Sequence, residues 1–498
     1  MPKPPSPVGD LNWSPERAEA MGTGAVALWK ELLERLSALP VARRWKDVHV
    51  AEKLALAVPD EPLTDAALTR HLREVMFDFS MYPGHPRFMA FITGAGTIPG
   101  AVADLLASAL NQNVGGWRLS PAATEIELFL GRFFAGVFGM AEGAGGIMVS
   151  GGAMANFVAL KAARDAMAKW NVREEGMRAG AELVLYASEE AHHVIDRGAD
   201  MLGLGSNAVR KIPVDGDFRM RIDALEARIA EDRARGLTPF AVVGTAGTVA
   251  TGSIDPLDRI ADVSAREKMW FHVDGAYGAL AMLAPELAPL FKGIARADSI
   301  AFDPHKWLYT PHSGGFVVVR DLQLLANAFS LHPTYVREDK EHTGNGLDMH
   351  MLGPQFSRGF SAFKVWLSLL AHGRSAYARR IGHDVELAKY MDARVRERPE
   401  LESMAKVTLS IACFRYVPRD LGAIEGREEY LDALNELLMA EIQMDGRAFC
   451  SNAVLAGRYA LRACIVNFRT EAGDVDALLD VACELGAKID RAKRPRVP

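Results

Sequence analysis

The sequence has little cysteine, no long hydrophobic run and almost no net charge. Four of its 498 residues are cysteines and none forms a CxxC pair, so we expect reduced thiols rather than a disulfide framework or a zinc site. No stretch is apolar over the about 18 residues that a bilayer span requires. The first residues lack the apolar core of a signal peptide. The formal charge of −6 does not favour nucleic acid or an anionic membrane as a partner. These absences predict a soluble, cytoplasmic protein.

Hydrophobic residues make up 49% of the chain, which is enough for a large core and for more than one domain. Residues Pro15 to Leu39 and Thr64 to Phe79 have helical periodicity, with apolar residues on one side that need a partner surface. Between Pro83 and Pro99 the chain is irregular and rich in glycine and proline. We therefore predict an N-terminal helical segment over residues 1–95.

Residues 96–373 alternate short apolar runs with amphipathic helices, which predicts a large α/β domain with a mainly parallel sheet. The expected strands cover residues 146–150, 182–187, 240–244, 270–274, 299–302 and 315–320. Ligands of such sheets bind at the carboxyl ends of the strands. Residues 374–498 contain two further apolar runs, at 407–414 and 459–467, between long helices. They predict a small C-terminal α+β domain.

The segment Ser299-Ile-Ala-Phe-Asp-Pro-His-Lys-Trp307 predicts a strand, a proline turn, and then His305 and Lys306. A lysine amine forms a Schiff base with a carbonyl cofactor when burial lowers its pKa enough for nucleophilic attack. The apolar and aromatic residues beside Lys306 argue against ordinary solvent exposure. A solvated loop lysine is the alternative.

Other expected strands also end in residues that could bind a cofactor or take part in catalysis. Asp274 ends the strand in His272-Val-Asp-Gly-Ala-Tyr-Gly278. A buried carboxylate at this position needs a cation, and a protonated pyridine nitrogen is a suitable one. The alternatives are that Asp274 caps a helix or binds a metal. The turn Ser150-Gly-Gly-Ala153 leads into a helix, so its amides can cradle a phosphate or form a plain tight turn. His192 and His193 lack the i, i+4 spacing of paired metal ligands. One of them could cover a cofactor ring, or both could lie on the surface, and we expect no metal.

In this order the segments resemble the group II pyridoxal-phosphate-dependent amino-acid decarboxylases, the family of aromatic-L-amino-acid, glutamate and histidine decarboxylases. The resemblance runs from His85-Pro-Arg-Phe88 to Leu461-Arg-Ala-Cys-Ile-Val-Asn-Phe-Arg-Thr470, and Asp-Pro-His-Lys-Trp is its most specific match. It implies the pyridoxal-phosphate (PLP) type I fold and an obligate homodimer with active sites at the interface, in which the N-terminal helices pack on the partner subunit. It also implies decarboxylation of an L-amino acid, with an aromatic one preferred, to the amine and CO₂.

The resemblance assigns roles to single residues. Lys306 is expected to form the Schiff base with pyridoxal 5′-phosphate, Asp274 to pair with the pyridine nitrogen, and His192 to stack on the ring. The other expected cofactor contacts are Gly151, Gly152, Ala153, Thr245, Ala276, Asp303 and His305. The expected substrate pocket, partly from the neighbouring subunit, is Tyr82, His85, Phe91, Asn113 and Trp117.

One segment departs from the family pattern. Residues 337–357 are polar and are expected to form a mobile loop, in which the family carries a tyrosine that protonates the carbanion. This chain has no tyrosine between Tyr335 and Tyr377, and the simplest alignment places Met349 there. His350 is a candidate proton donor, or an ordinary loop histidine. Because family members without the tyrosine can divert the carbanion to oxygen, an aldehyde product is an alternative.

Other functions remain open. Arg87 or Arg118 could bind the second carboxylate of an acidic amino acid. An aminotransferase of the same fold could use Arg462 or Arg469 for the substrate carboxylate. A catalytically silent scaffold is the least expected alternative, because it has no need of a buried lysine and carboxylate.

Overall fold

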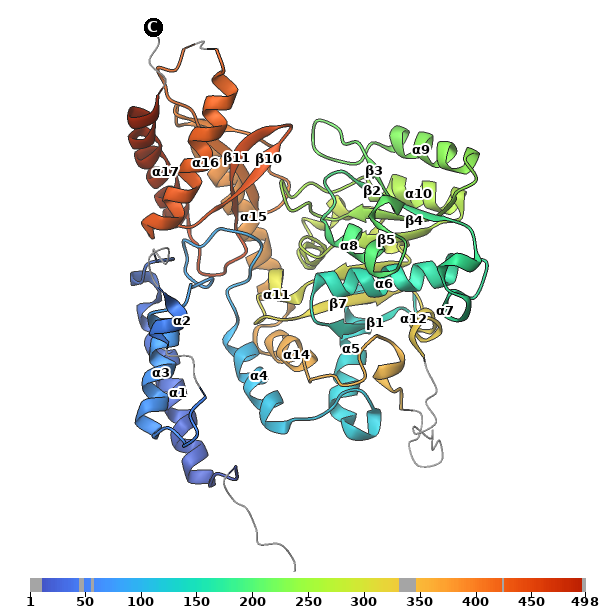
Figure 1. The fold of residues 1–498 in the computed structure, drawn as a ribbon, viewed down its shortest axis with the longest axis horizontal. Coiled ribbons are helices and arrows are strands. Elements are labelled where there is room, and N and C mark those ends of the chain that lie inside the picture. Colours follow the sequence, from blue (N-terminus) through green and yellow to red (C-terminus); the bar gives the residue numbers. More distant parts are fainter. Residues whose placement is uncertain (1–10, 44–48, 55–57, 331–345, 423–424, 495–498) are drawn as a thin grey trace, which may run out of the picture.

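The computed structural model describes residues 11–43, 49–54, 58–330, 346–422 and 425–494 (Figure 1). Its N-terminal part contains the two expected helices, α1 (Pro15–Arg35) and α3 (Asp65–Phe77), with the short α2 (Val50–Lys53) between them. Ser14 and Thr64 cap the two long helices by accepting a hydrogen bond from the backbone three residues on. These helices lie along one edge of the molecule, away from the larger sheet (Figure 1).

A seven-stranded sheet has the order β1-β7-β6-β5-β4-β2-β3. Its strands are β1 (Gly145–Val149), β2 (Leu183–Ser188), β3 (Val209–Ile212), β4 (Thr238–Thr245), β5 (Trp270–Asp274), β6 (Ser299–Phe302) and β7 (Gly315–Val319). The pairings from β6 through β5, β4 and β2 to β3 are parallel, and only β7 runs antiparallel to its neighbours β6 and β1. The prediction of a mainly parallel sheet is confirmed, and β3 is the strand that was not predicted.

Helices cover both faces of this sheet. Val242 and Val243, consecutive on β4, belong to separate apolar clusters because successive side chains of a strand point to opposite faces. The helix α6 packs against one face, where it contacts β4, β5, β6 and β7. The longer helices of this part are α4 (Ile98–Leu110), α5 (Pro121–Val137), α6 (Gly152–Met167), α8 (Val194–Met201), α9 (Ile222–Ala234), α10 (Leu257–Glu267), α12 (Leu322–Phe329) and α14 (Ala362–His372), and α7 (Val172–Glu175) and α11 (Pro304–Trp307) are single turns. The expected α/β class is therefore confirmed.

A second sheet of four antiparallel strands has the order β10-β11-β9-β8. Its strands are β8 (Leu401–Ser403), β9 (Ile411–Tyr416), β10 (Ser451–Leu455) and β11 (Arg458–Cys464). The helices α15 (Arg374–Arg396), α16 (Arg427–Asp445) and α17 (Ala472–Lys493) contact these strands or one another. Both predicted strands exist, but β9 begins four residues later and β11 ends three residues earlier than predicted. The boundaries near residues 95 and 373 stay predictions.

Two expectations from the sequence concern disulfide bonds and membrane-spanning helices. All four cysteines are free thiols, and Cys413, Cys450 and Cys464 are buried. Burial raises the pKa of Cys413 and of Cys450 to about 12, so both stay protonated at neutral pH. Within the ranges that the structure describes, no helix combines the length and the apolar character needed to traverse a bilayer.

Candidate active site

The lysine turn α11 (Pro304–Trp307) follows β6 directly, and Asp303 separates the two. Lys306 Nζ lies 2.9 Å from Asp303 Oδ2, and the Lys306 side chain is only 19% exposed. The other oxygen of Asp303 is buried and has no hydrogen-bond partner among the described residues. Lys306 is therefore not a solvated loop lysine. It is a partly buried amine whose one ionic partner lies three residues earlier.

Asp274 ends β5, the strand next to β6. It is buried, and its Oδ1 accepts a hydrogen bond from the Ala276 amide over 3.1 Å. In the sheet register Asp274 is the partner of Thr245 on β4 and of Ala301 on β6. The Thr245 hydroxyl is buried and has no partner among the described residues. Adjacent parallel strands thus bring Thr245, Asp274 and the lysine turn to one edge of the sheet.

The N-terminus of α6 meets the same edge. A Cβ atom built on Gly152 would lie 2.6 Å from Asp303 Oδ2 and 3.2 Å from the Ala276 Cβ, so only glycine fits at this close approach. A phosphate group suits the free amides at such a helix end. Asp303 suits the phosphate less well, because its carboxylate is an anion that already pairs with Lys306. The residues present therefore fit a phosphate-bearing carbonyl cofactor, held mainly by the amides of residues 151–153.

His192 precedes α8, and its Nδ1 accepts a hydrogen bond from the Val194 amide over 3.1 Å. Partial burial lowers the pKa of His192, the Asp274 carboxylate opposes this effect, and the Lys306 ammonium reinforces it. His192 therefore lies within electrostatic reach of both groups and is neutral at pH 7. The His193 ring is tilted by 56° from it with centroids 6.4 Å apart, and it faces solvent. No group of three or more metal-ligating side chains exists in the part of the chain that the structure describes.

His272 is a buried residue that the sequence did not single out. It lies two positions before Asp274 and on the same face of β5. Asn156 donates from Nδ2 to the Gly152 carbonyl, so its Oδ1 accepts a hydrogen bond from His272 Nε2 over 2.8 Å. Ser299 Oγ then lies 2.9 Å from the second ring nitrogen of His272. Burial lowers the pKa of His272 to about 4, so its ring is neutral at pH 7. The ring links β5 to α6, the helix whose N-terminus could bind a phosphate.

Two of the expected substrate residues use their polar atoms within the chain. The Tyr82 hydroxyl donates to the carbonyls of Met76 and Phe77 over 2.9 and 3.1 Å. His85 Nδ1 accepts from the Arg87 amide over 3.0 Å, and burial lowers the pKa of the ring. Both side chains are buried. Phe91 differs, because 57% of its surface is exposed. Its backbone is in the left-handed conformation, with φ of +54°.

Asn113 and Trp117 contact the segment that contains His350. Asn113 Oδ1 accepts from the amides of Gly115 and Arg358 over 2.9 and 3.0 Å. The Trp117 amide donates to Asp348 Oδ1 over 2.7 Å. Asn113 therefore fixes the backbone of two segments, and its amide oxygen is already used. Nothing among the described contacts joins these two residues to Lys306 within one chain.

The described part of the expected loop is packed around Met349 and His350, whereas residues 354–357 are exposed. Met349 is fully buried, and His350 is only 8% exposed within the turn η8 (Met349–Met351). The His350 ring stacks on Phe356 with centroids 5.1 Å apart, and its Nδ1 donates to the Gly115 carbonyl over 3.0 Å. Its Nε2 is buried and has no partner among the described residues. Residues 337–345 lie outside the described part, and the mobility of the loop stays a prediction.

Arg462 on β11 has an unusual environment. It is only 2% exposed, and its NH1 donates to the Phe91 carbonyl and to Ser451 Oγ over 3.0 and 3.1 Å. Its Nε and NH2 are buried and lack partners among the described residues. A buried guanidinium with free N–H groups favours an anionic ligand. In contrast, Arg87 pairs with Asp474 over 3.1 Å and Arg118 is exposed.

Comparisons with known proteins identify the family of the chain. The family description "Pyridoxal-dependent decarboxylase conserved domain" matches residues 48–417. The chain is 32% identical to an aromatic-L-amino-acid decarboxylase of Bacillus atrophaeus over 93% of this chain and 94% of that protein, and 32% identical to the Sus scrofa enzyme of the same name over 84% and 85%. A solved structure of Oryza sativa TDC with PLP and tryptamine superposes with a TM-score of 0.89 at 26% identity, over 96% of this chain and 99% of that one. These matches confirm the PLP type I fold and the resemblance drawn from the sequence. The chain belongs to the pyridoxal-dependent decarboxylase family and is an amino-acid decarboxylase whose cofactor is pyridoxal 5′-phosphate.

Proposed function

We propose that the chain converts an aromatic L-amino acid to the corresponding amine and CO₂, with the cofactor attached covalently to Lys306. The main support is the meeting of the Lys306 amine, the Asp274 carboxylate and the N-terminus of α6 at one edge of the sheet. The names of the relatives support an aromatic substrate.

Each of these residues has a distinct task. When bound, pyridoxal phosphate supplies an electron sink for the charge left on the substrate Cα as CO₂ departs. Asp274 holds a proton on the ring nitrogen, because a buried carboxylate stabilises a cation beside it. The neutral His272 behind it adds no positive charge that would weaken this pair. His192 would cover the ring of the bound cofactor, and the amides at the start of α6 would bind its phosphate.

His350 is our candidate for the residue that returns a proton to the substrate Cα. Its buried Nε2 has no partner among the described residues. Because Nδ1 already donates to the Gly115 carbonyl, Nε2 carries an N–H only in the doubly protonated ring, and it is this form that can pass a proton to a substrate. Met349 is not a substitute, because its side chain is packed in an apolar cluster and carries no proton. In the assembled enzyme His350 would act on a site to which two subunits contribute.

A second candidate activity is oxygen-dependent. No tyrosine lies between Tyr335 and Tyr377, so the segment lacks the phenol that the family uses. In this route the amino acid, O₂ and water give the aldehyde, CO₂, ammonia and hydrogen peroxide. O₂ accepts the two electrons that the first route returns to the substrate as a C–H bond.

An acidic amino acid is the other substrate that a specific observation favours. The two free N–H groups of Arg462 could bind a second carboxylate in a bidentate pair. Phe91, whose carbonyl Arg462 contacts, is an expected pocket residue, so the guanidinium lies next to the proposed substrate position. The aromatic and acidic proposals therefore differ in which of the two kinds of amino acid is decarboxylated faster.

A panel of amino acids with mass-spectrometric product analysis tests these proposals. We expect CO₂ and amine in equal amounts, fastest from an aromatic amino acid, with oxygen uptake absent. Lys306→Ala should lose both the cofactor absorption band and turnover. Aldehyde with hydrogen peroxide in place of amine would establish the oxygen-dependent route, and a preference for glutamate that Arg462→Met removes would establish the acidic one. A cofactor-free wild-type protein, or one that exchanges amino groups with a 2-oxo acid, would refute the proposal.

We propose a homodimer as well. Four large apolar side chains of α4 are exposed: Ile98, Leu105, Leu106 and Leu110. In α1 and α3 only Leu28 and Phe77 are buried. Exposed apolar surface of this extent is typical of an interface. Sedimentation equilibrium should give twice the mass of one chain, and a monomer at micromolar concentration would refute the dimer. The cytoplasmic location stays a prediction.

A further inference from the structure

One buried carboxylate, Asp384 on α15, holds the lysine turn from behind. Trp307 Nε1 donates to Asp384 Oδ2 over 2.9 Å, and the Tyr309 hydroxyl donates to the same oxygen over 2.6 Å. The two aromatic residues follow Lys306 by one and three positions, and both are buried. A single side chain thus fixes both residues on the C-terminal side of the lysine.

Asp384 is itself fixed through its other oxygen. Arg380 donates to Oδ1 from Nε and NH2 over 2.8 and 2.7 Å, and it also donates to the carbonyls of Asn467 and Thr470. Burial raises the pKa of Asp384, and the Arg380 guanidinium opposes this effect. The two hydrogen bonds from the Arg380 guanidinium favour the ionised form of Asp384 as the acceptor for Trp307 and Tyr309. The pair of Arg380 and Asp384 also ties the lysine turn to the segment after β11.

A second contact extends the support to the segment after Asp274. The Trp307 ring stacks on Tyr277 with centroids 5.0 Å apart and an angle of 18° between the planes. The Tyr277 hydroxyl is 2.7 Å from Ser410 Oγ, and it accepts a hydrogen bond from the Ser410 amide over 2.9 Å. The residues that follow Lys306 and those that follow Asp274 are thus packed as one unit.

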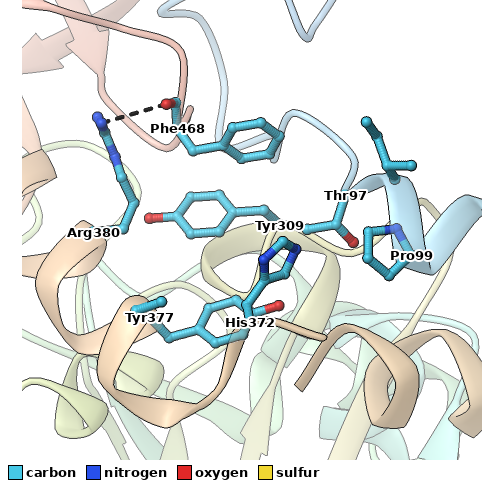
Figure 2. Close-up of a pocket in the computed structure, with 9 residues that line it drawn as sticks. Thr97, Pro99, Tyr309, His372, Tyr377, Arg380 and Phe468 are labelled. Atoms are coloured by element: carbon cyan, nitrogen blue, oxygen red, sulfur yellow. Dashed lines mark hydrogen bonds between the residues drawn. The ribbon is translucent and has the colours of Figure 1, made fainter. Parts of the chain in front are cut away.

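Packing and the hydrogen bond to Asp384 together fix Tyr309. A cavity of about 260 Å³ lies beside its ring, lined also by Arg380, Tyr377, His372 and Phe468. Figure 2 shows the Tyr309 ring between Phe468 on one side and His372 with Tyr377 on the other. Tyr309 has φ of +52°, a conformation that bulky residues adopt only where the surroundings enforce it. The side chains around Tyr309 enclose the ring, and the hydrogen bond to Asp384 fixes the end that carries the hydroxyl.

We propose that Asp384 is a positioning residue for Lys306. Through Trp307 and Tyr309 it fixes the turn of α11 and so the direction in which the lysine amine meets the cofactor. The inference rests on the proposed function, in which Lys306 holds the cofactor. A displacement of about 1 Å by a residue remote from the reacting atoms lowers a rate by up to about a hundredfold.

The experiment compares two tyrosines that line the same cavity. Tyr309→Phe removes only the hydroxyl that reaches Asp384, and Asp384→Asn removes the charged acceptor. Tyr377→Phe is the matched control, because its ring stacks on Tyr309 with centroids 6.4 Å apart and makes no hydrogen bond to Asp384. We expect Tyr309→Phe and Asp384→Asn to lower kcat roughly tenfold to a hundredfold at unchanged KM. Both should alter the circular dichroism of the cofactor absorption band, which reports ring orientation, and the control should alter neither.

A second measurement uses the cofactor-free protein. Amide hydrogen exchange over residues 304–310 should increase in Tyr309→Phe and Asp384→Asn, and the double variant should exchange no faster than Asp384→Asn alone. If Asp384→Asn does not fold, Tyr309→Phe alone tests the positioning role. Variants that lower only Tm, with wild-type kcat, dichroism and exchange, would refute the positioning role. A wild-type protein that shows neither the cofactor absorption band nor turnover would refute the proposed function instead. The hydrogen-exchange data would still test the contact between Asp384 and Tyr309.

Discussion

The proposed cofactor side and the proposed substrate side of the site are built in different ways. On the cofactor side, Asp274 and Thr245 end neighbouring strands of one sheet, and Lys306 follows the next strand. On the proposed substrate side, Phe91 and Trp117 lie outside the sheet. The Phe91 backbone bonds to the side chains of Ser451 and Arg462. The Trp117 amide and indole bond to the side chains of Asp348 and Glu125. The first group is fixed by the register of a sheet, and the second depends on segments that contact other parts of the chain.

This difference predicts a difference in function. A buried group on a strand cannot adjust its position, so its loss leaves an unpaired charge or an unfilled space. A partly exposed group on an irregular segment can be replaced with small shifts. Substitutions on the cofactor side should therefore lower the rate and change the spectrum, and those on the substrate side should change KM alone.

The largest effect is expected for Asp274→Asn. Removing one partner of a buried ion pair costs about 3 to 5 kcal/mol, which corresponds to a loss of kcat between about a hundredfold and several thousandfold. The cofactor absorption band should shift as well, because the ring nitrogen loses the carboxylate that keeps it protonated. Stopped-flow absorbance and steady-state kinetics measure both quantities.

Asp298→Asn is the control for Asp274→Asn. Asp298 is a carboxylate that contacts the opposite end of the same strand, where it accepts a hydrogen bond from the Phe271 amide over 2.7 Å. This variant should retain the spectrum and most of kcat. Equal losses in the two variants would mean that the strand, and not the charge of Asp274, matters.

The same division explains what the sequence could predict. The strand that ends in Asp274 and the strand that precedes the lysine turn were predictable because buried strands are continuous apolar runs. The strand β3, with the sequence Val-Arg-Lys-Ile, was missed because half of it is polar. His272 was missed because its partners Asn156 and Ser299 are distant in the sequence. The packed state of His350 was also not predictable, since its polar segment meets Gly115 only in the fold.

The buried His272 gives a pH dependence of stability on the cofactor side. The pKa of His272 falls from 6.5 to about 4 on folding. The unfolded chain therefore binds a proton that the folded protein does not. The contribution is complete above about pH 6.5 and is lost as the pH falls toward 4, by up to about 3 kcal/mol. Urea unfolding at a series of pH values measures it.

His272→Gln sharpens this test, because glutamine can still bond to Asn156 and Ser299 but does not titrate in this range. Its free energy of unfolding should fall less steeply between pH 6.5 and 4 than that of the wild type. Parallel curves for the two proteins would show that another group causes the acid sensitivity.

His192→Leu should have a smaller effect. A ring that stacks on the cofactor contributes about 0.5 to 1.5 kcal/mol beyond its buried area, so cofactor affinity should fall by about twofold to twelvefold. Equilibrium dialysis of the apoprotein with pyridoxal phosphate measures this change. His193→Leu is the control, since its ring faces solvent. Unchanged affinity in both variants would remove His192 from the cofactor site.

The smallest effect is expected on the substrate side, for Phe91→Leu. The leucine keeps most of the apolar surface and loses only the contact between rings, so KM for an aromatic amino acid should rise about twofold to fivefold. The absorption band and kcat should not change, because Phe91 lies outside the sheet edge that holds Asp274 and Lys306. Phe129→Leu is the control, as this ring on α5 is similarly exposed at 48%. A fall in kcat for Phe91→Leu would show that the two sides of the site are coupled, and an equal rise in KM for aliphatic substrates would show that the ring has no part in specificity.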